Sequence, residues 1–72
     1  MICNKCGRVI NEDDNGILLE DVCEVRKEWG YFSKKDLAVH SFALCESCYD
    51  EMIKSFSVPV KVEEKSIELK KN

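Results

Sequence analysis

Five cysteines stand out in this 72-residue chain, because thiolates bind soft metal ions and take part in redox exchange. Four of them form two Cys-x-x-Cys pairs, Cys3 with Cys6 and Cys45 with Cys48. Zn²⁺ takes four ligands in a tetrahedron and favours thiolate sulfur, and two cysteines three positions apart can clamp one ion from a single turn. The pattern therefore predicts one structural Zn²⁺ ion per chain, bound by all four.

Other uses of the paired cysteines compete with structural zinc. Four thiolates also suit a rubredoxin-type iron, but Tyr49 follows the second pair where matching rubredoxin knuckles would have a glycine turn. A thiol redox centre at Cys45 and Cys48 is a further hypothesis, since thiol pKa falls at a helix N-terminus, although no βαβ context is evident. A closed four-thiolate site has no open coordination position, so we expect no enzymatic activity.

The size and composition of the chain favour a metal-stabilised domain. A 72-residue chain buries a small core, and small domains often need a staple. The odd cysteine count fits a disulfide framework poorly, and Met1 is followed by no apolar leader, so we expect a cytoplasmic protein with reduced thiols. No apolar run approaches the roughly 20 residues of a membrane span, so no membrane association is expected. The formal charge of −3 does not favour nucleic acid as a partner.

The elements that must position the cysteines follow from the pattern around them. Gly7 predicts a tight turn with positive φ that completes a knuckle around the first pair. Alternation predicts a strand over Ile17–Trp29 and an antiparallel partner over Leu37–Leu44, joined by a turn at Ser33–Asp36. Arg8–Ile10 reads as a short strand returning from the knuckle.

A helix is predicted over Cys45–Phe56, where apolar residues recur with helical spacing. Pro59 ends it, and alternating valines predict a short strand over Val58–Val62. A second short alternation falls at Ile67 and Leu69. We therefore divide the chain into a zinc-binding domain, residues 1–62, and a polar C-terminal tail, residues 63–72. Knuckle, hairpin and a helix carrying the second pair follow one another as in a treble-clef zinc finger, which makes the predicted fold a small α+β domain.

Three further features carry a structural and a functional interpretation. Cys23 reads as a small buried hydrophobe, with an intermolecular disulfide or a replacement ligand as alternatives. The single histidine, His40, reads as a core-edge or surface residue rather than a spare ligand. The aromatic segment with Trp29, Tyr31 and Phe32 is expected to cover the small core, and its alternative is an exposed anchor for a protein partner.

Three segments of the chain together resemble a group of short four-cysteine proteins from bacterial chromosomes, phages and integrative elements. These segments are Cys3-x-x-Cys-Gly7, Glu28-Trp-Gly-Tyr31 and Leu44-Cys-Glu-Ser-Cys-Tyr-Asp50. That group is treated as uncharacterised zinc-ribbon or treble-clef proteins. The resemblance covers roughly residues 3–62 and implies zinc binding by the four paired cysteines, with no settled activity.

The resulting hypothesis is a non-enzymatic zinc module that acts as a protein-interaction or regulatory adaptor. Its partner is expected to be a protein, and a free strand edge in the hairpin or at Val58–Val62 could pair with a second copy to give a homodimer. The alternative is a nucleic-acid-binding finger in regulation of a mobile element. That function needs a local basic patch, which would be built from Lys5, Arg8, Lys34 and Lys35.

Overall fold

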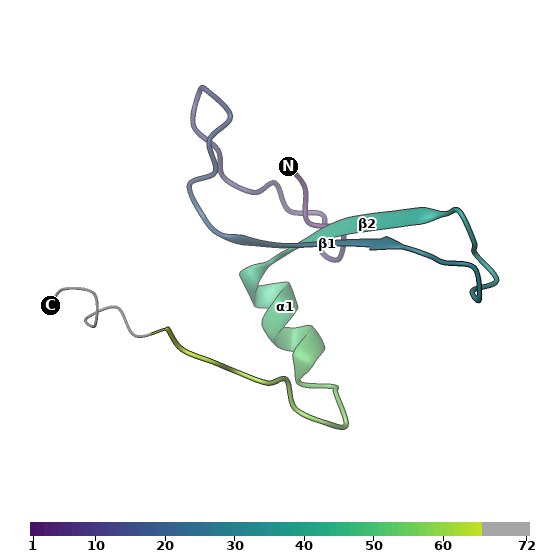
Figure 1. Cartoon of the computed structure of the whole chain (residues 1–72). Coiled ribbons are helices and arrows are strands. Elements are labelled where there is room, and N and C mark those ends of the chain that lie inside the picture. Colours follow the sequence, from purple (N-terminus) through teal and green to yellow (C-terminus); the bar gives the residue numbers. More distant parts are fainter. Residues whose placement is uncertain (66–72) are drawn as a thin grey trace, which may run out of the picture.

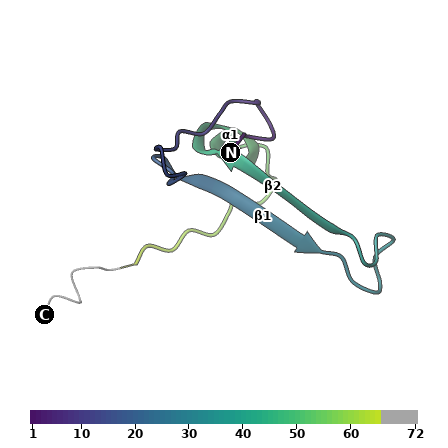
Figure 2. The ribbon, with the colours of Figure 1, turned by 90° about the horizontal axis from the view of Figure 1, so that it is seen from above.

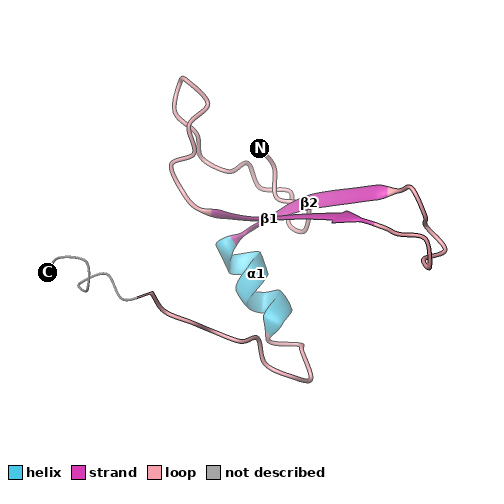
Figure 3. Cartoon of the chain, viewed as in Figure 1, coloured by secondary structure: helices cyan, strands magenta, loops and turns pink. Residues whose placement is uncertain are grey.

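A computed structural model of the chain describes residues 1–65, and it contains one hairpin and one helix. The strands are β1, Val22–Glu28, and β2, Val39–Cys45; the helix α1, Glu46–Ile53, follows β2 directly (Figures 1 and 3). The N-terminal segment folds back against the end of the hairpin from which α1 departs. The prediction of a small α+β domain is thus confirmed, whereas the alternation at Ile67 and Leu69 lies outside the described residues.

The predicted antiparallel hairpin is present, but its first strand is shorter than predicted. β1 and β2 pair in register from Val22 opposite Cys45 to Glu28 opposite Val39. Residues 17–21 of the predicted strand lie outside β1, and Leu18 forms an isolated bridge with Glu12 instead. This bridge closes a separate turn, in which the Asp13 carboxylate accepts the N–H groups of Asn15 and Ile17 at 2.8 and 2.9 Å. Because Asx turns of this kind compete with strand pairing, the regular ladder begins only at Val22.

The core is small and lies entirely at one end of the hairpin. In the part of the chain that the structure describes, six residues are buried, and they come from the N-terminal segment, the end of β2 and the start of α1: Cys3, Ile10, Ala43, Leu44, Cys45 and Cys48. Leu18, Val22, Cys23 and Met52 pack against it while half-buried. Only three of the six are not cysteines, so hydrocarbon burial alone gives this core little stability.

The far end of the hairpin extends well beyond this core (Figure 2). We call residues 29–38 the hairpin tip. Its side chains Tyr31, Phe32 and Leu37 are 80%, 98% and 91% exposed. The expectation that the aromatic segment covers the core is therefore wrong for Tyr31 and Phe32, because the tip lies too far from the core to reach it.

The hairpin tip has an internal structure of its own. The Trp29 ring is half-buried and is covered by Lys35 Nζ at 4.3 Å, Lys27 Nζ at 5.4 Å and the His40 ring at 6.0 Å between centroids. The chain then turns back with Leu37 at φ 74°, a left-handed conformation that costs a leucine about 1–2 kcal/mol. Three flanking groups thus support one aromatic ring, and the exposed leucine is held in a strained backbone.

The C-terminal part of the fold departs from the prediction in two ways. The helix ends at Ile53 instead of Phe56, and the Ser55 hydroxyl donates to the carbonyl of Met52 at 2.7 Å. Val58–Val62 forms no strand: Val58 and Val62 are 77% and 72% exposed, and within residues 1–65 this segment pairs with no other strand. Alternating valines alone do not make a strand, because a strand needs an edge to pair with. No helix in the described part of the chain has both the length and the apolar character needed to span a membrane.

Candidate metal site

The two Cys-x-x-Cys pairs meet at the core end of the hairpin. The sulfur atoms of Cys3, Cys6, Cys45 and Cys48 all lie within 4.8 Å of one another, and we call these four residues the cysteine cluster. Cys6 Sγ and Cys45 Sγ, from different pairs, are 3.9 Å apart. All five cysteines of the chain are free, and three members of the cluster are buried while Cys6 is exposed. The predicted ligand residues are therefore brought together in space, and they could hold one metal ion.

The spacing of the sulfur atoms fits a tetrahedral thiolate site. A Zn–S bond length of about 2.3 Å implies that neighbouring sulfurs of a regular tetrahedron lie about 3.8 Å apart. The separation of 3.9 Å between Cys6 and Cys45 is close to that value, and the 4.8 Å upper limit needs only a small contraction. Four soft donors with no oxygen or nitrogen ligand among them suit zinc or iron rather than calcium or magnesium.

The first pair is positioned by a tight turn. Gly7 adopts φ 79°, as predicted, and its N–H donates to the Cys3 carbonyl at 2.9 Å. The N–H of Cys6 points at Cys3 Sγ, 3.5 Å away. Together with the N–H groups of Cys45 and Lys5, this donor lowers the pKa of the Cys3 thiol from 9.0 to about 6. The knuckle thus favours a thiolate before any ion binds.

The second pair is positioned by the junction of β2 and α1. Cys45 is the last residue of β2 and the N-cap of α1, with an extended backbone (φ −70°, ψ 163°), and Cys48 lies in the first helical turn. The N–H of Cys48 lowers the pKa of Cys45, as expected at a helix N-terminus. Burial and the neighbouring thiols raise the pKa of Cys48 to about 12. A metal ion would therefore have to displace the proton of Cys48, and it would repay that cost through its own charge.

Arg8 and Lys5 place positive charge beside the cluster. The Arg8 guanidinium donates to both carboxylate oxygens of Glu20, at 3.0 and 2.7 Å, and it also faces the Cys45 thiol. Lys5 Nζ lies 2.7 Å from Glu51 of α1, and the pKa of Lys5 is raised by Glu51 first and, more weakly, by Cys48 and Cys6 of the cluster. Four thiolates and a divalent cation carry a net charge of −2, and each of these cations, although paired with a carboxylate, lies close enough to interact favourably with that charge. Both pairs also tie the knuckle to other parts of the fold.

Glu20 is the most strongly perturbed acid in this group. It accepts both Arg8 hydrogen bonds and a third from the backbone N–H of Asn11 at 3.0 Å. These hydrogen bonds lower the pKa of the Glu20 carboxyl to about 2, and those from Arg8 have a larger effect than the one from Asn11. Glu20 therefore stays ionised and holds the Arg8 guanidinium against the cluster.

Asn4, between the first two cysteines, attaches the knuckle to the hairpin. Its backbone N–H donates to the Ala43 carbonyl at 2.8 Å, and its side-chain Oδ1 accepts the Ala43 N–H at 2.9 Å. Asn4 therefore satisfies both outward-facing backbone groups of Ala43, as a neighbouring strand would. Sequence reasoning missed this role, and also the link from Arg8 to Glu20. The only local signal was an amide side chain between two candidate ligands.

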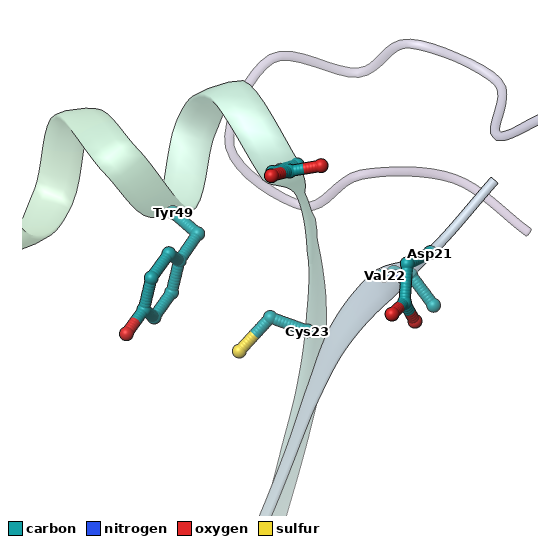
Figure 4. A pocket seen from close by; sticks show the side chains of 5 residues that line it. Asp21, Val22, Cys23 and Tyr49 are labelled. Carbon is teal, nitrogen blue, oxygen red and sulfur yellow. The ribbon is translucent and has the colours of Figure 1, made fainter. Parts of the chain in front are cut away.

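Neither Cys23 nor His40 belongs to the cluster. Cys23 is half-buried against the core, as its interpretation as a small hydrophobe predicted, and it lines an open pocket of about 320 Å³ with Asp21, Val22, Glu46 and Tyr49 (Figure 4). Its side chain lies on the same side of the hairpin as Tyr49 of α1. His40 is exposed beside the Trp29 ring, which confirms its interpretation as a surface residue.

The chain was also compared with known proteins. No protein-family model, no curated protein and no solved structure matches it. The features that define the site are its four converging thiols, two flanking cations and backbone N–H groups that favour thiolates.

Proposed function

We propose that this chain is a non-enzymatic module with one structural Zn²⁺ ion and that it acts as a protein-interaction or regulatory adaptor. The convergence of the four sulfur atoms within 4.8 Å carries the proposal. Four thiolates complete the coordination of zinc, so the ion has no open position for a substrate or a reactive water. The arrangement of knuckle, hairpin and helix is consistent with a treble clef. In this proposal the metal holds the core together, and function lies on the surface that the core supports.

The hairpin tip is the surface we assign to the partner. Tyr31, Phe32 and Leu37 are almost fully exposed, and the first two rings form an edge-to-face pair with centroids 5.2 Å apart. Aromatic side chains dominate the energetics of many protein interfaces, and exposed apolar groups gathered at one place favour contact with another protein. Trp29 of the same tip is flanked by Lys27 and Lys35, which pack over its ring.

The nucleic-acid alternative has less support. Lys5 and Arg8 lie at the knuckle and are paired with Glu51 and Glu20, whereas Lys34 and Lys35 lie in the hairpin tip at the opposite end (Figure 1). The four cations therefore do not form one basic patch. An electrostatic nucleic-acid site requires clustered cations. Absence of DNA binding at low salt would eliminate this function.

Native mass spectrometry with elemental analysis tests the metal assignment. We expect one zinc per chain, and loss of the ion should accompany unfolding. A chain with iron, or with no metal after purification under reducing conditions, would contradict the proposal. The thiol redox alternative predicts reduction of insulin disulfides and alkylation of the thiols without prior chelation.

Cross-linking followed by mass spectrometry tests the adaptor role. Phe32→Ala should abolish cross-links to a partner that the unmodified chain captures. Phe56→Ala is the matched control, because Phe56 is also a partly exposed aromatic residue but lies beyond α1, away from the tip. If no partner distinguishes the two variants, the tip is not the interaction surface.

A further inference from the structure

The outer edge of β1 presents unpaired backbone groups. The Trp29 N–H donates to the Ala38 carbonyl at 2.9 Å. In an antiparallel pair, alternate residues of a strand bond to the partner strand, so the odd-numbered residues of β1 bond to β2. The N–H and C=O groups of the even-numbered residues of β1 therefore point outward. On β2 the same alternation points the N–H and C=O groups of Ala43 outward, and Asn4 forms hydrogen bonds with both of them, in agreement with this assignment. Within residues 1–65, β1 pairs with β2 alone, so Glu24, Arg26 and Glu28 form a free edge.

We propose that this edge binds the same edge of a second copy of the chain, antiparallel and about a two-fold axis through Val25. The two hairpins then form one four-stranded sheet. This inference goes beyond the proposed adaptor function, because it assigns a second interaction surface that is separate from the hairpin tip. The partner is another copy because the charges along the edge are complementary to themselves.

The charge order along β1 supports this register. With the axis at Val25, Glu24 lies opposite Arg26 of the second copy, and Arg26 lies opposite Glu24 of the second copy. Both pairs join opposite charges in directly opposed positions, which stabilises antiparallel strands. Their backbone groups face each other as well, so these two pairs supply four backbone hydrogen bonds.

Neighbouring registers are disfavoured by like charges. An axis at Arg26 places Arg26 opposite Arg26 and Glu24 opposite Glu28. An axis at Lys27 also joins Arg26 with Glu28 of the second copy, but it sets two lysines face to face between those pairs, where the axis at Val25 sets two valines. An axis at Glu24 opposes two glutamates. Registers between these do not bring outward-facing backbone groups together. Charged residues normally protect a strand edge from pairing, and among the registers compared only the axis at Val25 opposes no like charges.

The apolar side chains of the hairpin favour the same arrangement. Val25 is half-buried, and its cross-strand neighbour Phe42 remains 38% exposed. The axis at Val25 sets the two valines side by side with a phenylalanine outside each, which forms a continuous apolar strip on one face of the new sheet. The interface is small, so we expect reversible association.

Charge reversal in the metal-loaded full chain tests this pairing. Sedimentation velocity over a range of concentrations should show a monomer–dimer equilibrium for the unmodified chain. Glu24→Arg and Arg26→Glu should each weaken association at least about tenfold, since either places like charges opposite each other twice. An equimolar mixture of the two variants should regain the dimer, because every pair in the mixed dimer joins opposite charges.

Two controls separate this interface from others. Glu28 pairs with Arg26 of its own strand at 2.6 Å but lies opposite Val22 of the second copy. Glu28→Arg makes the same change of charge as Glu24→Arg and leaves Arg26 free to pair with Glu24 of the second copy, so association should persist. Arg26→Pro removes one outward N–H and leaves the ladder with β2 intact, so it should abolish association. Metal content and circular dichroism establish that each variant is folded. A chain that stays monomeric at millimolar concentration, a mixture that does not associate, or a dimer that survives Arg26→Pro would each overturn the proposal.

Discussion

Cys45→Ser is the perturbation that most directly tests whether the metal site holds the fold together. Cys45 is buried, is the final residue of β2 and is the N-cap of α1. The hydroxyl that replaces the thiol is nearly isosteric but is a poor zinc ligand at neutral pH. We expect the variant to lose its ion and to show no cooperative thermal transition.

The magnitude follows from the composition of the core. Among residues 1–65, and apart from the cysteines, only Ile10 and Leu44 are large buried side chains, 1% and 4% exposed. Burial of each contributes about 1.5–3 kcal/mol, so together they supply about 3–6 kcal/mol. Structural zinc contributes about 10–16 kcal/mol in small finger peptides, whereas a chain of this length is expected to have a net stability of about 4–11 kcal/mol. The free energy lost with the ion is therefore about equal to or larger than the net stability of the whole domain.

The assay is thermal unfolding followed by far-ultraviolet circular dichroism, with zinc content measured on the same samples. Cys23→Ser is the matched control, because it makes the same substitution at a half-buried cysteine outside the cluster. That variant should retain one zinc and unfold cooperatively. The unmodified chain should unfold when a strong chelator removes the ion and refold when zinc is restored.

A cooperative, metal-free transition in Cys45→Ser would refute the reasoning. It would mean that hydrogen bonds and the few buried aliphatic groups suffice to hold the knuckle, hairpin and helix together. Equal loss of structure in Cys45→Ser and Cys23→Ser would also refute it, because the effect would then reflect general sensitivity to cysteine replacement.

Four further outcomes follow from particular contacts. Arg8→Ala should weaken zinc binding about tenfold to a hundredfold in a competition titration, because it removes the cation that faces Cys45, and Arg8→Lys should restore part of the loss. Asn4→Ala should lower the free energy of unfolding by about 1–3 kcal/mol, since it leaves the Ala43 N–H without its acceptor, whereas Asn4→Asp keeps an acceptor and should cost less. Leu37→Gly should raise the free energy of unfolding by about 1 kcal/mol, because glycine adopts the positive φ of this position without the strain that leucine has there. The same variant should weaken partner binding at the tip. A lower free energy of unfolding in the variant would show that the leucine backbone is not strained. The pKa of Glu20 is lowered to about 2, so its ion pair with Arg8 stabilises the fold fully above the ordinary pKa of 4.5, and this stabilisation is lost as pH falls toward 2. Glu20→Gln should therefore lower the melting temperature by the same amount at about pH 6 and at about pH 8. A loss of melting temperature that differs between these two pH values would contradict this.

The cysteine cluster was the part of the structure most accessible to sequence reasoning. Two cysteines three positions apart impose a local geometry whatever surrounds them, and Gly7 marks the positive φ that the first pair requires. The hairpin was also predictable, since alternation reports the faces of a strand. Its exact start was not, because the Asp13 turn and the bridge between Glu12 and Leu18 hold the preceding residues away from the ladder.

Other features depended on distance and could not be inferred from local patterns. Tyr31 and Phe32 were assigned to the core because a small chain needs its aromatic residues, but the length of the hairpin carries them beyond it. The alternation at Val58–Val62 looked like a strand but has no pairing partner among the described residues. Asn4 shows the reverse case, because its contacts join residues 39 positions apart in the sequence and leave no local trace.

The position of the core at one end of the hairpin has a consequence for how such a chain diverges in evolution. The six residues that are buried within residues 1–65 all lie at the metal end, and residues 29–38 contribute none of them. Insertions, deletions and substitutions in that segment leave the knuckle and the start of α1 undisturbed, so the tip is free to change its binding specificity while the scaffold persists. Two descendants of one ancestor would then share four cysteines, a glycine turn and a few core positions, and little else.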